Sequence, residues 1–179
     1  MFTPSALNYA DQATAEDAAH SLTDLRVISK QSRIVKEEAP SPHTTLTMLE
    51  DTASKLGWDG VRTMASAQAL FEQGLITYPR TDSTHVAPNA KEAATEIIRD
   101  RYGANTLKGG ALALFLSAGK DELGAHEAVR PADPMQFPEH QAGLLPDQDA
   151  LYTLIWERFI SSQMKAARYQ VIDVELESV

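Results

Sequence analysis

The sequence contains no cysteine, and this absence excludes several kinds of protein. Disulfide scaffolds, Cys-ligated zinc sites and thiol nucleophiles all need cysteine, and a cysteine-free chain fits a reducing compartment. Long apolar runs are also missing: the longest, residues 109–118, is about half of the roughly 20 residues that a membrane-spanning helix needs. No basic segment followed by an apolar one comes after Met1, so a secretory signal is not indicated. We therefore expect a cytoplasmic protein that does not enter a membrane.

Positive charge is scarce as well. The chain of 179 residues has 16 Lys and Arg against 25 Asp and Glu, which gives a net charge of −9. This acidic total argues mildly against a nucleic-acid partner, although a local site can oppose the bulk charge. Apolar residues make up 43% and charged residues 23%, an ordinary globular balance that excludes a disordered chain, a collagen and a coiled coil.

The N-terminal part combines a helical and an extended pattern. Residues 14–25 place Ala and Leu side chains on one helical face, and Thr14 and Asp17 have the spacing of a capping box. Residues 26–36 are rich in β-branched side chains and are expected to be extended. The prolines within residues 37–43 predict a segment boundary.

The central part is mainly helical. The predicted elements are helices over 45–56, 61–73 and 88–102 and a short β-favouring run over 75–78. In the first helix, the residues expected to face the core are Leu46, Leu49, Ala53 and Leu56. Asp59 is expected to cap the second helix and Gly74 to end it. The order helix, turn, helix, strand is that of a helix-turn-helix with a wing, although two packed helices joined by a short turn occur in many helical domains.

The C-terminal part predicts one helix and one strand. The helix is capped by Asp147 or Asp149 and runs to about Ala166, and residues 170–179 alternate as a half-buried strand does. Residues 104–146 show no clear pattern. Because the last strand reaches the chain end without a turn, we expect the chain to have been cut from a longer protein. The fold class is α+β, mainly helical, with a helical block inserted into a β-containing domain.

The densest polar cluster spans residues 77–83, Thr-Tyr-Pro-Arg-Thr-Asp-Ser. In an extended segment, residues i and i+2 face the same side, so Tyr78 and Arg80 could address one target. A phenol can attack phosphorus while a guanidinium binds the non-bridging oxygens, and Thr81, Asp82 and Ser83 could hold the loop or contact a phosphate. Composition alone favours a structural interpretation, in which the Tyr78 ring packs, Arg80 pairs with Asp82 and the loop is a capped turn.

A second polar cluster spans residues 126–131, His-Glu-Ala-Val-Arg-Pro. If this segment is helical, His126 and Arg130 share a face and could both reach a phosphate, and His126 could move a proton. The structural alternative is a histidine at a helix end beside a surface ion pair through Glu127. The histidines show no zinc-type spacing, and no Walker loop is present.

Together these motifs resemble the type IA DNA topoisomerases. Residues 74–83 look like the active-site signature of that family, and residues 126–131 are similar to its second signature in the form typical of bacterial members. Residues 42–57 resemble the beginning of the family's helical domain, and residues 154–164 its end. Four blocks in the correct order over about residues 40–179 are highly specific, so the resemblance outweighs the structural interpretations. The chain differs from the family at His43, where Phe is frequent.

The resemblance implies a role for each site residue. Tyr78 would be the nucleophile and Arg80 would position the scissile phosphate. The DNA-binding residues would be Thr81, Asp82, Ser83, His126 and Arg130. The reaction would join single-stranded DNA to Tyr78 through a 5′-phosphotyrosine, without ATP, and strand passage would then relax negatively supercoiled DNA.

The resemblance also implies partners that this chain lacks. In the family, an acidic domain called Toprim supplies the Mg²⁺ ligands and a catalytic glutamate, and nothing in this chain resembles it. Mg²⁺ would therefore act only in the intact enzyme, with no metal ligand here, and the chain alone is expected to be inactive. Its partners would be single-stranded or underwound DNA and the remaining domains of the parent chain, in a monomer.

The implied domain arrangement is a winged-helix-like (CAP-like) helical domain over 41–142. It would lie between two legs of a β-containing arch domain, residues 1–40 and residues 143–179. Two other functions stay open. A non-enzymatic winged-helix DNA-binding module would need basic residues on the helix after Gly60, which carries only Arg62. A protein-interaction domain would use the apolar stretch 111–118.

Overall fold

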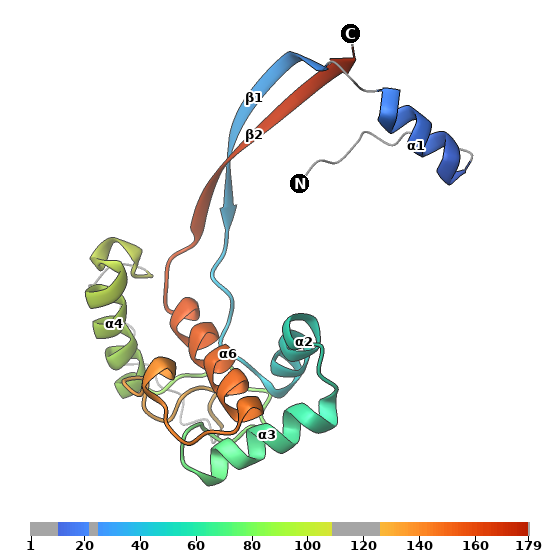
Figure 1. Cartoon of the computed structure of the whole chain (residues 1–179). Helices are drawn as coiled ribbons and strands as arrows, with labels where there is room; N and C mark the ends of the chain where they lie inside the picture. The colour runs from blue at the N-terminus through green and yellow to red at the C-terminus, as the bar shows by residue number, and fades with distance from the viewer. Residues whose placement is uncertain (1–10, 22–24, 109–125, 179) are drawn as a thin grey trace. The chain divides into compact units, whose positions relative to one another are not determined.

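The computed structural model describes residues 11–21, 25–108 and 126–178 (Figure 1). The chain divides into two compact units, and each is described by itself. The strand unit comprises Met1–Lys36 and Arg168–Val179, and the helical unit comprises Glu37–Ala167. Within the described residues, no helix has both the length and the apolar character that crossing a membrane requires. The apolar stretch 111–118, proposed above as an interaction surface, lies outside the described residues.

The helix of the strand unit begins earlier than the sequence predicted. Helix α1 spans Gln12–Ser21, and the side chain of Asp11 accepts a 2.9 Å hydrogen bond from the Thr14 amide. The predicted capping box of Thr14 and Asp17 is therefore wrong, because the cap lies one turn further toward the N-terminus. The predicted C-terminal end at residue 25 is also wrong, since Leu25 begins the first strand.

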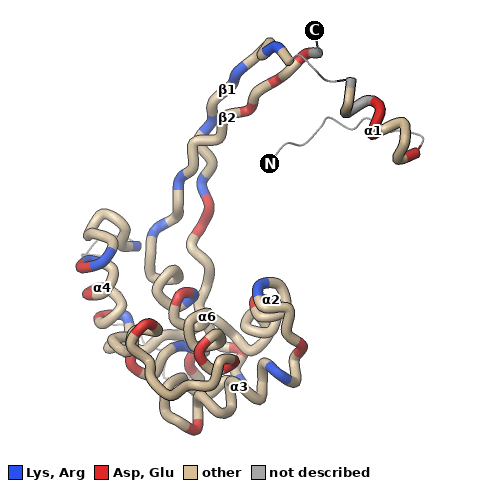
Figure 2. The backbone as a smooth tube through the Cα atoms, in the orientation of Figure 1, with Lys and Arg blue, Asp and Glu red and all other residues tan. Residues whose placement is uncertain are grey.

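Strands β1 (Leu25–Glu37) and β2 (Ala167–Ser178) form a two-stranded antiparallel sheet. The sequence predicted both extended segments but not their pairing. Figure 2 shows basic residues along β1 and acidic residues along much of β2, and cross-strand ion pairs of 2.9 Å join Arg26 to Glu177 and Arg33 to Asp173. The prediction of a half-buried β2 is wrong, because Ile172 and Val174 are each 47% exposed. Two strands alone cannot bury a face.

The helical unit begins with the helix pair that the sequence predicted. Helix α2 spans Thr45–Leu56 and helix α3 spans Gly60–Glu72. Gly57 ends α2 with a φ of 68°, a left-handed conformation that favours glycine. The Asp59 carboxylate caps α3 by accepting the Arg62 amide at 2.8 Å, as expected. Thr44 caps α2 in a capping box with Thr47.

The face that α2 turns to the core differs in part from the prediction, although Leu56 packs against the core as expected. Met48 and Thr52 are fully buried, whereas Leu46 is 64% exposed. The Thr52 hydroxyl lies 2.9 Å from the Thr63 hydroxyl of α3, so a hydrogen-bonded pair of polar side chains joins the two helices. The apolar pattern missed this face because a buried threonine appears polar in a hydrophobicity pattern.

Two further helices are described in this unit. Helix α4 spans Pro88–Tyr102 and ends at Gly103, as predicted. Helix α6 spans Pro146–Ser162, with Leu145 as its N-cap residue, so the predicted caps Asp147 and Asp149 are wrong. Short 3-10 turns η1 (Ala104–Thr106) and η2 (Pro138–His140) lie between them. Helix α6 ends before Ala166 because the chain after it pairs with the segment after η1, where Leu107 and Met164 form a bridge.

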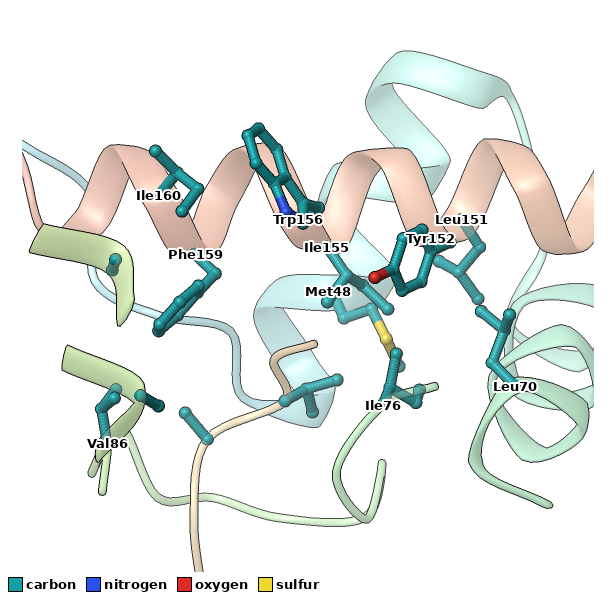
Figure 3. Packing of buried hydrophobic residues seen from close by; sticks show 14 of the residues in the cluster. Met48, Leu70, Ile76, Val86, Leu151, Tyr152, Ile155, Trp156, Phe159 and Ile160 are labelled. Carbon is teal, nitrogen blue, oxygen red and sulfur yellow. The ribbon is translucent and has the colours of Figure 1, made fainter. Parts of the chain in front are cut away.

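The core of the helical unit forms around α6 (Figure 3). The α6 side chains that it contains are Leu151, Tyr152, Ile155, Trp156, Phe159 and Ile160. They pack with Met48 of α2 and Leu70 of α3, and with Ile76 in the segment that leads to the first polar cluster. Trp156 also donates through its indole nitrogen to the Pro134 carbonyl at 2.9 Å, which ties the irregular segment before η2 to α6. The first polar cluster is thus anchored directly on the core.

Candidate active site

The two sequence motifs lie side by side in the structure. Ile76 forms an antiparallel bridge with Pro131, and the Thr77 amide donates to the Arg130 carbonyl at 2.9 Å. The predicted β-favouring run over 75–78 therefore pairs with the second motif without becoming a full strand, since Pro79 and Pro131 lack the amide donors that a ladder needs. The second motif is not helical, so the condition under which His126 and Arg130 would share a helical face is not met.

The Thr77 side chain strengthens this pairing. Its hydroxyl donates to the Ala128 carbonyl at 2.7 Å and accepts the Arg130 amide at 3.0 Å. Thr77 is consequently fixed on the second motif by both its backbone and its side chain. Tyr78 follows immediately, so the backbone that leads into it is held in place.

Tyr78 is 45% exposed. Its ring meets the Phe71 ring edge-on, with 5.4 Å between centroids and an interplanar angle of 70°. Among the described residues, no hydrogen-bond partner is found for its hydroxyl, and no ion pair joins Arg80 to Asp82. The structural interpretation is therefore confirmed for Tyr78, whose ring packs on Phe71. It is not confirmed for Arg80, which forms no ion pair with Asp82 in the part of the chain described.

The loop after Tyr78 is attached to the beginning of α2. The Thr45 hydroxyl accepts the Thr81 amide at 2.8 Å and lies 2.7 Å from the Pro79 carbonyl. The Thr45 amide also donates to the Thr81 carbonyl at 2.8 Å. Further along, the Thr81 hydroxyl accepts the Ser83 amide at 3.1 Å, which makes this part a tight turn. The exposed Arg80 thus projects from a loop whose backbone is fixed on both sides.

An open pocket of about 610 Å³ lies beside this loop. It is lined by Thr44, Thr45, Leu46, Arg80, Thr81, Asp82 and His126. Arg80 and the exposed His126 come from different motifs, so the fold unites them as potential donors to an anion. Tyr78 and Ser83 are not among the lining residues. The Ser83 hydroxyl instead accepts the His85 amide at 3.0 Å.

Arg130 does not present its guanidinium to this pocket. The residue is 6% exposed, and its terminal nitrogens donate to Glu127 at 2.7 Å and to the Pro131 carbonyl at 2.8 Å. The second carboxylate oxygen of Glu127 accepts the Ala87 amide at 2.7 Å, just before α4. The pair is thus a buried brace between the second motif and α4, unlike the surface ion pair considered from the sequence.

A buried histidine lies behind the second motif. His43 is fully buried, its carbonyl accepts the Val129 amide at 2.8 Å, and its Nε2 lies 3.7 Å from Asp51. The His43 pKa is lowered from 6.5 to about 4, mainly by burial and also by the positive charge of Arg158, against the opposing effect of Asp51. The ring is therefore neutral at physiological pH. Sequence reasoning gave neither His43 nor Thr45 a role, because their partners are distant in sequence.

The side chains that the structure describes do not form a metal site made wholly of protein ligands. Across residues 11–21, 25–108 and 126–178, no three His, Asp or Glu side chains converge on a point where a metal ion could sit. Mg²⁺ is commonly bound by one or two carboxylates together with waters and substrate phosphates, so this finding concerns only a site made wholly of protein ligands. We therefore derive no chemical step through a metal from these residues.

Comparison with known proteins places the chain. A family model described as DNA topoisomerase matches residues 4–179. The chain is 36% identical over 176 residues to DNA topoisomerase 1 of Fervidobacterium islandicum, covering 92% of the chain and 25% of that protein. It is 39% identical over 153 residues to DNA topoisomerase 1 of Synechococcus elongatus, covering 85% and 17%. The solved structure of full-length topoisomerase I from Thermotoga maritima matches with a TM-score of 0.68 and 35% identity, covering 92% of this chain and 27% of that one.

Proposed function

The chain belongs to the bacterial type IA DNA topoisomerase family, and we propose that it carries the nucleophile of such an enzyme, Tyr78. The observation that supports this most is the placement of Tyr78. It is half exposed, and hydrogen-bonded segments hold the backbone on both sides of it beside the pocket that unites Arg80 and His126. A side chain in that position can meet a phosphodiester while its backbone stays fixed.

The proposed reaction is a transesterification on single-stranded DNA. The Tyr78 hydroxyl oxygen bonds to phosphorus, and the bond between phosphorus and the 3′ oxygen breaks. The phenol loses its proton, and the leaving 3′ oxygen takes one up. The product is a 5′-phosphotyrosine and a free 3′-hydroxyl, which reverses the reaction after another strand has passed through the gap. Because the ester preserves the bond energy, relaxation of negatively supercoiled DNA needs no ATP.

Arg80 and His126 are proposed to hold the phosphate. A guanidinium matches two non-bridging oxygens with two parallel hydrogen bonds and neutralises charge that develops during attack. His126 adds a second donor from across the pocket, and Thr81, Asp82 and Ser83 shape the loop that the DNA backbone follows. Arg130 would support this surface through its backbone and its buried pair with Glu127, since its guanidinium is occupied.

The activity is proposed for a longer protein, because the chain spans only 17–27% of the length of the relatives described above. The strand unit, Met1–Lys36 and Arg168–Val179, would belong to the arch domain, and the helical unit, Glu37–Ala167, would be the winged-helix-like domain. This boundary differs from the expected 41–142 because α6 lies in the core of the helical unit. A Toprim domain elsewhere would supply the Mg²⁺ ligands. We propose a cytoplasmic monomer whose partners are single-stranded or underwound DNA and the remaining domains.

The alternative is a winged-helix module that binds duplex DNA without catalysis. Its recognition helix would be α3, whose only basic residue is Arg62. Arg62 is occupied: it donates to both carboxylate oxygens of Asp147 at 2.8 and 2.7 Å and lies 4.5 Å over the Trp58 ring. A salt-dependent mobility-shift assay with single- and double-stranded DNA separates the functions. A preference for single strands supports the topoisomerase, a preference for duplex the alternative, and no binding an interaction domain.

A further inference from the structure

One hydroxyl connects α2 to the loop that carries Arg80. The Thr45 Oγ1 lies 2.8 Å from the Thr81 amide nitrogen, 2.7 Å from the Pro79 carbonyl oxygen and 3.0 Å from the Thr81 carbonyl oxygen. A hydroxyl has a single proton to donate, so it can serve only one of the two carbonyls at a time. The Thr45 backbone amide already donates to the Thr81 carbonyl at 2.8 Å. The hydroxyl proton is thereby left for Pro79.

These bonds fix the two peptide groups that flank Arg80. The Pro79 carbonyl belongs to the peptide before Arg80, and the Thr81 amide belongs to the peptide after it. Because a peptide group is planar, holding both groups leaves the Arg80 backbone little freedom to rotate. The proline ring also fixes the φ angle of Pro79. Thr77, which precedes Tyr78, is hydrogen-bonded to Arg130 of the second motif. The relative placement of Tyr78 and Arg80 therefore depends on Thr45.

Helix α2, which carries Thr45, is itself held in place by the core. Thr45 is the first residue of α2, directly after the N-cap residue Thr44, which forms a capping box with Thr47. Further along the same helix, Met48 and Thr52 are fully buried in the core of the helical unit. A helix anchored in this way gives the hydroxyl a fixed position, which a loop residue would not have.

We propose that Thr45 is a positioning residue for DNA cleavage: its hydroxyl sets the arrangement of Tyr78 and Arg80 and donates no hydrogen bond to DNA, although the residue lines the pocket. The inference rests on the proposed function. The Thr45 hydroxyl donates its proton to the Pro79 carbonyl and accepts the Thr81 amide, so the proton is unavailable to a phosphate. Misplacing reacting groups by about 1 Å can cost on the order of 10²-fold in rate. Loss of this hydroxyl should thus reduce the rate of cleavage while leaving DNA affinity in place.

The experiment compares two variants in the full-length protein that contains this chain. Thr45→Val keeps the shape of the side chain and removes the hydroxyl, whereas Thr45→Ser keeps the hydroxyl. A matched control is Thr95→Val, which removes a hydroxyl that donates to the Lys91 carbonyl within α4 at 2.8 Å. Each protein is assayed for the single-turnover rate of covalent adduct formation with a labelled single-stranded oligonucleotide. Equilibrium binding of the same oligonucleotide and the thermal unfolding midpoint are measured in parallel.

We expect Thr45→Val to form adduct at least about tenfold more slowly, with binding within about twofold of the unmodified protein. Thr45→Ser should restore most of the rate, and Thr95→Val should leave it unchanged. A Thr45→Val protein that cleaves at the normal rate would overturn the inference. So would a proportional loss of binding, which would place Thr45 in contact with DNA. If Thr45→Ser cleaves as slowly as Thr45→Val, the hydroxyl is not what positions Tyr78 and Arg80, and the inference is overturned.

The experiment distinguishes a failure of the proposed function from a failure of the Thr45 inference alone. If the unmodified full-length protein binds the oligonucleotide but forms no adduct, Tyr78 is not a nucleophile, and the role of Thr45 in cleavage is overturned with it. If the unmodified protein forms adduct on Tyr78 and Thr45→Val does so equally fast, the proposed function stands and only the positioning role is contradicted.

Discussion

Thr77 and Arg130 hold each other through backbone and side chain although they are 53 positions apart in the sequence. The Thr77 amide donates to the Arg130 carbonyl at 2.9 Å, and the Arg130 amide donates to the Thr77 hydroxyl at 3.0 Å. This contact brings the two sequence motifs together at one site. It also fixes the backbone immediately before Tyr78, which is where a nucleophile needs a rigid support.

Replacing Arg80 by Lys should impair cleavage in the full-length protein. A lysine keeps the positive charge but cannot reproduce the two parallel hydrogen bonds of a guanidinium. Loss of one preorganised donor typically costs about 10²-fold in rate, so we expect a reduction of that order in adduct formation on single-stranded DNA. The control is Arg99→Lys, an exposed position near the end of α4. Equal rates for both variants would remove Arg80 from the proposed chemistry.

Replacing Arg130 by Ala should destabilise the helical unit. The side chain is 6% exposed, and its removal leaves the partly buried Glu127 carboxylate without its cation. Breaking a fully buried ion pair on one side costs about 3–5 kcal/mol. Because the Glu127 side chain is 30% exposed, we expect the free energy of unfolding in urea to fall by an amount at the lower end of that range.

The matched control for Arg130 is Lys55→Ala. Lys55 also pairs with a carboxylate, Asp51, at 3.0 Å, but its side chain is 59% exposed. An exposed pair of this kind is worth at most about 1 kcal/mol. Comparable losses in the two variants would mean that the Arg130 pair is not the buried brace described above.

His43 should make the stability of the chain depend on pH. Its folded pKa is about 4 and its ordinary value is 6.5, so between these values the unfolded chain binds a proton that the folded chain does not. The His43 contribution is therefore fully present above pH 6.5 and is lost as the pH falls toward 4. The shift corresponds to about 3 kcal/mol in free energy of unfolding.

The variant His43→Phe tests this, because it removes the titrating ring while other acidic groups stay. The free energy of unfolding should fall less steeply for the variant than for the unmodified chain between pH 6.5 and 4. Urea unfolding at several pH values measures both slopes. Parallel curves would show that the His43 ring titrates normally in the folded protein, in disagreement with its burial beside Arg158.

The 179-residue chain alone should not cleave DNA. Among its described residues no carboxylate cluster fits Mg²⁺, and the proposal assigns the metal and acid groups to another domain. Incubation with labelled single-stranded oligonucleotide and Mg²⁺, followed by denaturing electrophoresis, should show no protein-linked label. Appreciable adduct on Tyr78 would mean that the side chains of this chain suffice for the reaction.

Local signals allowed the helices to be predicted well from the sequence. Helix α4 begins at Pro88 and ends at Gly103, and Asp59 and Gly74 lie at the two ends of α3. Each of these residues determines a helix end through its own backbone or through residues next to it in the sequence. The core-facing side of α2 was missed because Thr52 is buried through a bond to Thr63, which an apolar pattern cannot register. The burial of β2 was overestimated because an alternation of apolar and polar residues predicts an apolar face but not the presence of another element packed against it.

The candidate site was predictable in part for the same reason. The motifs around Tyr78 and His126 could be identified, and the structure shows that they lie beside each other; the chemical roles of their residues remain predictions. Arg130 gave no sign of burial, because a charged residue is expected at the surface until its partner is known. Thr45 gave no sign either, since the carbonyl and amide that it binds lie 34 and 36 positions further along the chain.

The central claim is that Tyr78 becomes bonded to DNA, and one measurement tests it directly. The full-length protein is incubated with Mg²⁺ and a single-stranded oligonucleotide labelled at its 3′ end, denatured and digested, and the nucleotide-bearing peptide is identified by mass spectrometry. We predict that this peptide contains Tyr78 and that Tyr78→Phe yields no adduct while binding the oligonucleotide as before. An adduct on another residue, or undiminished adduct in Tyr78→Phe, would contradict the claim.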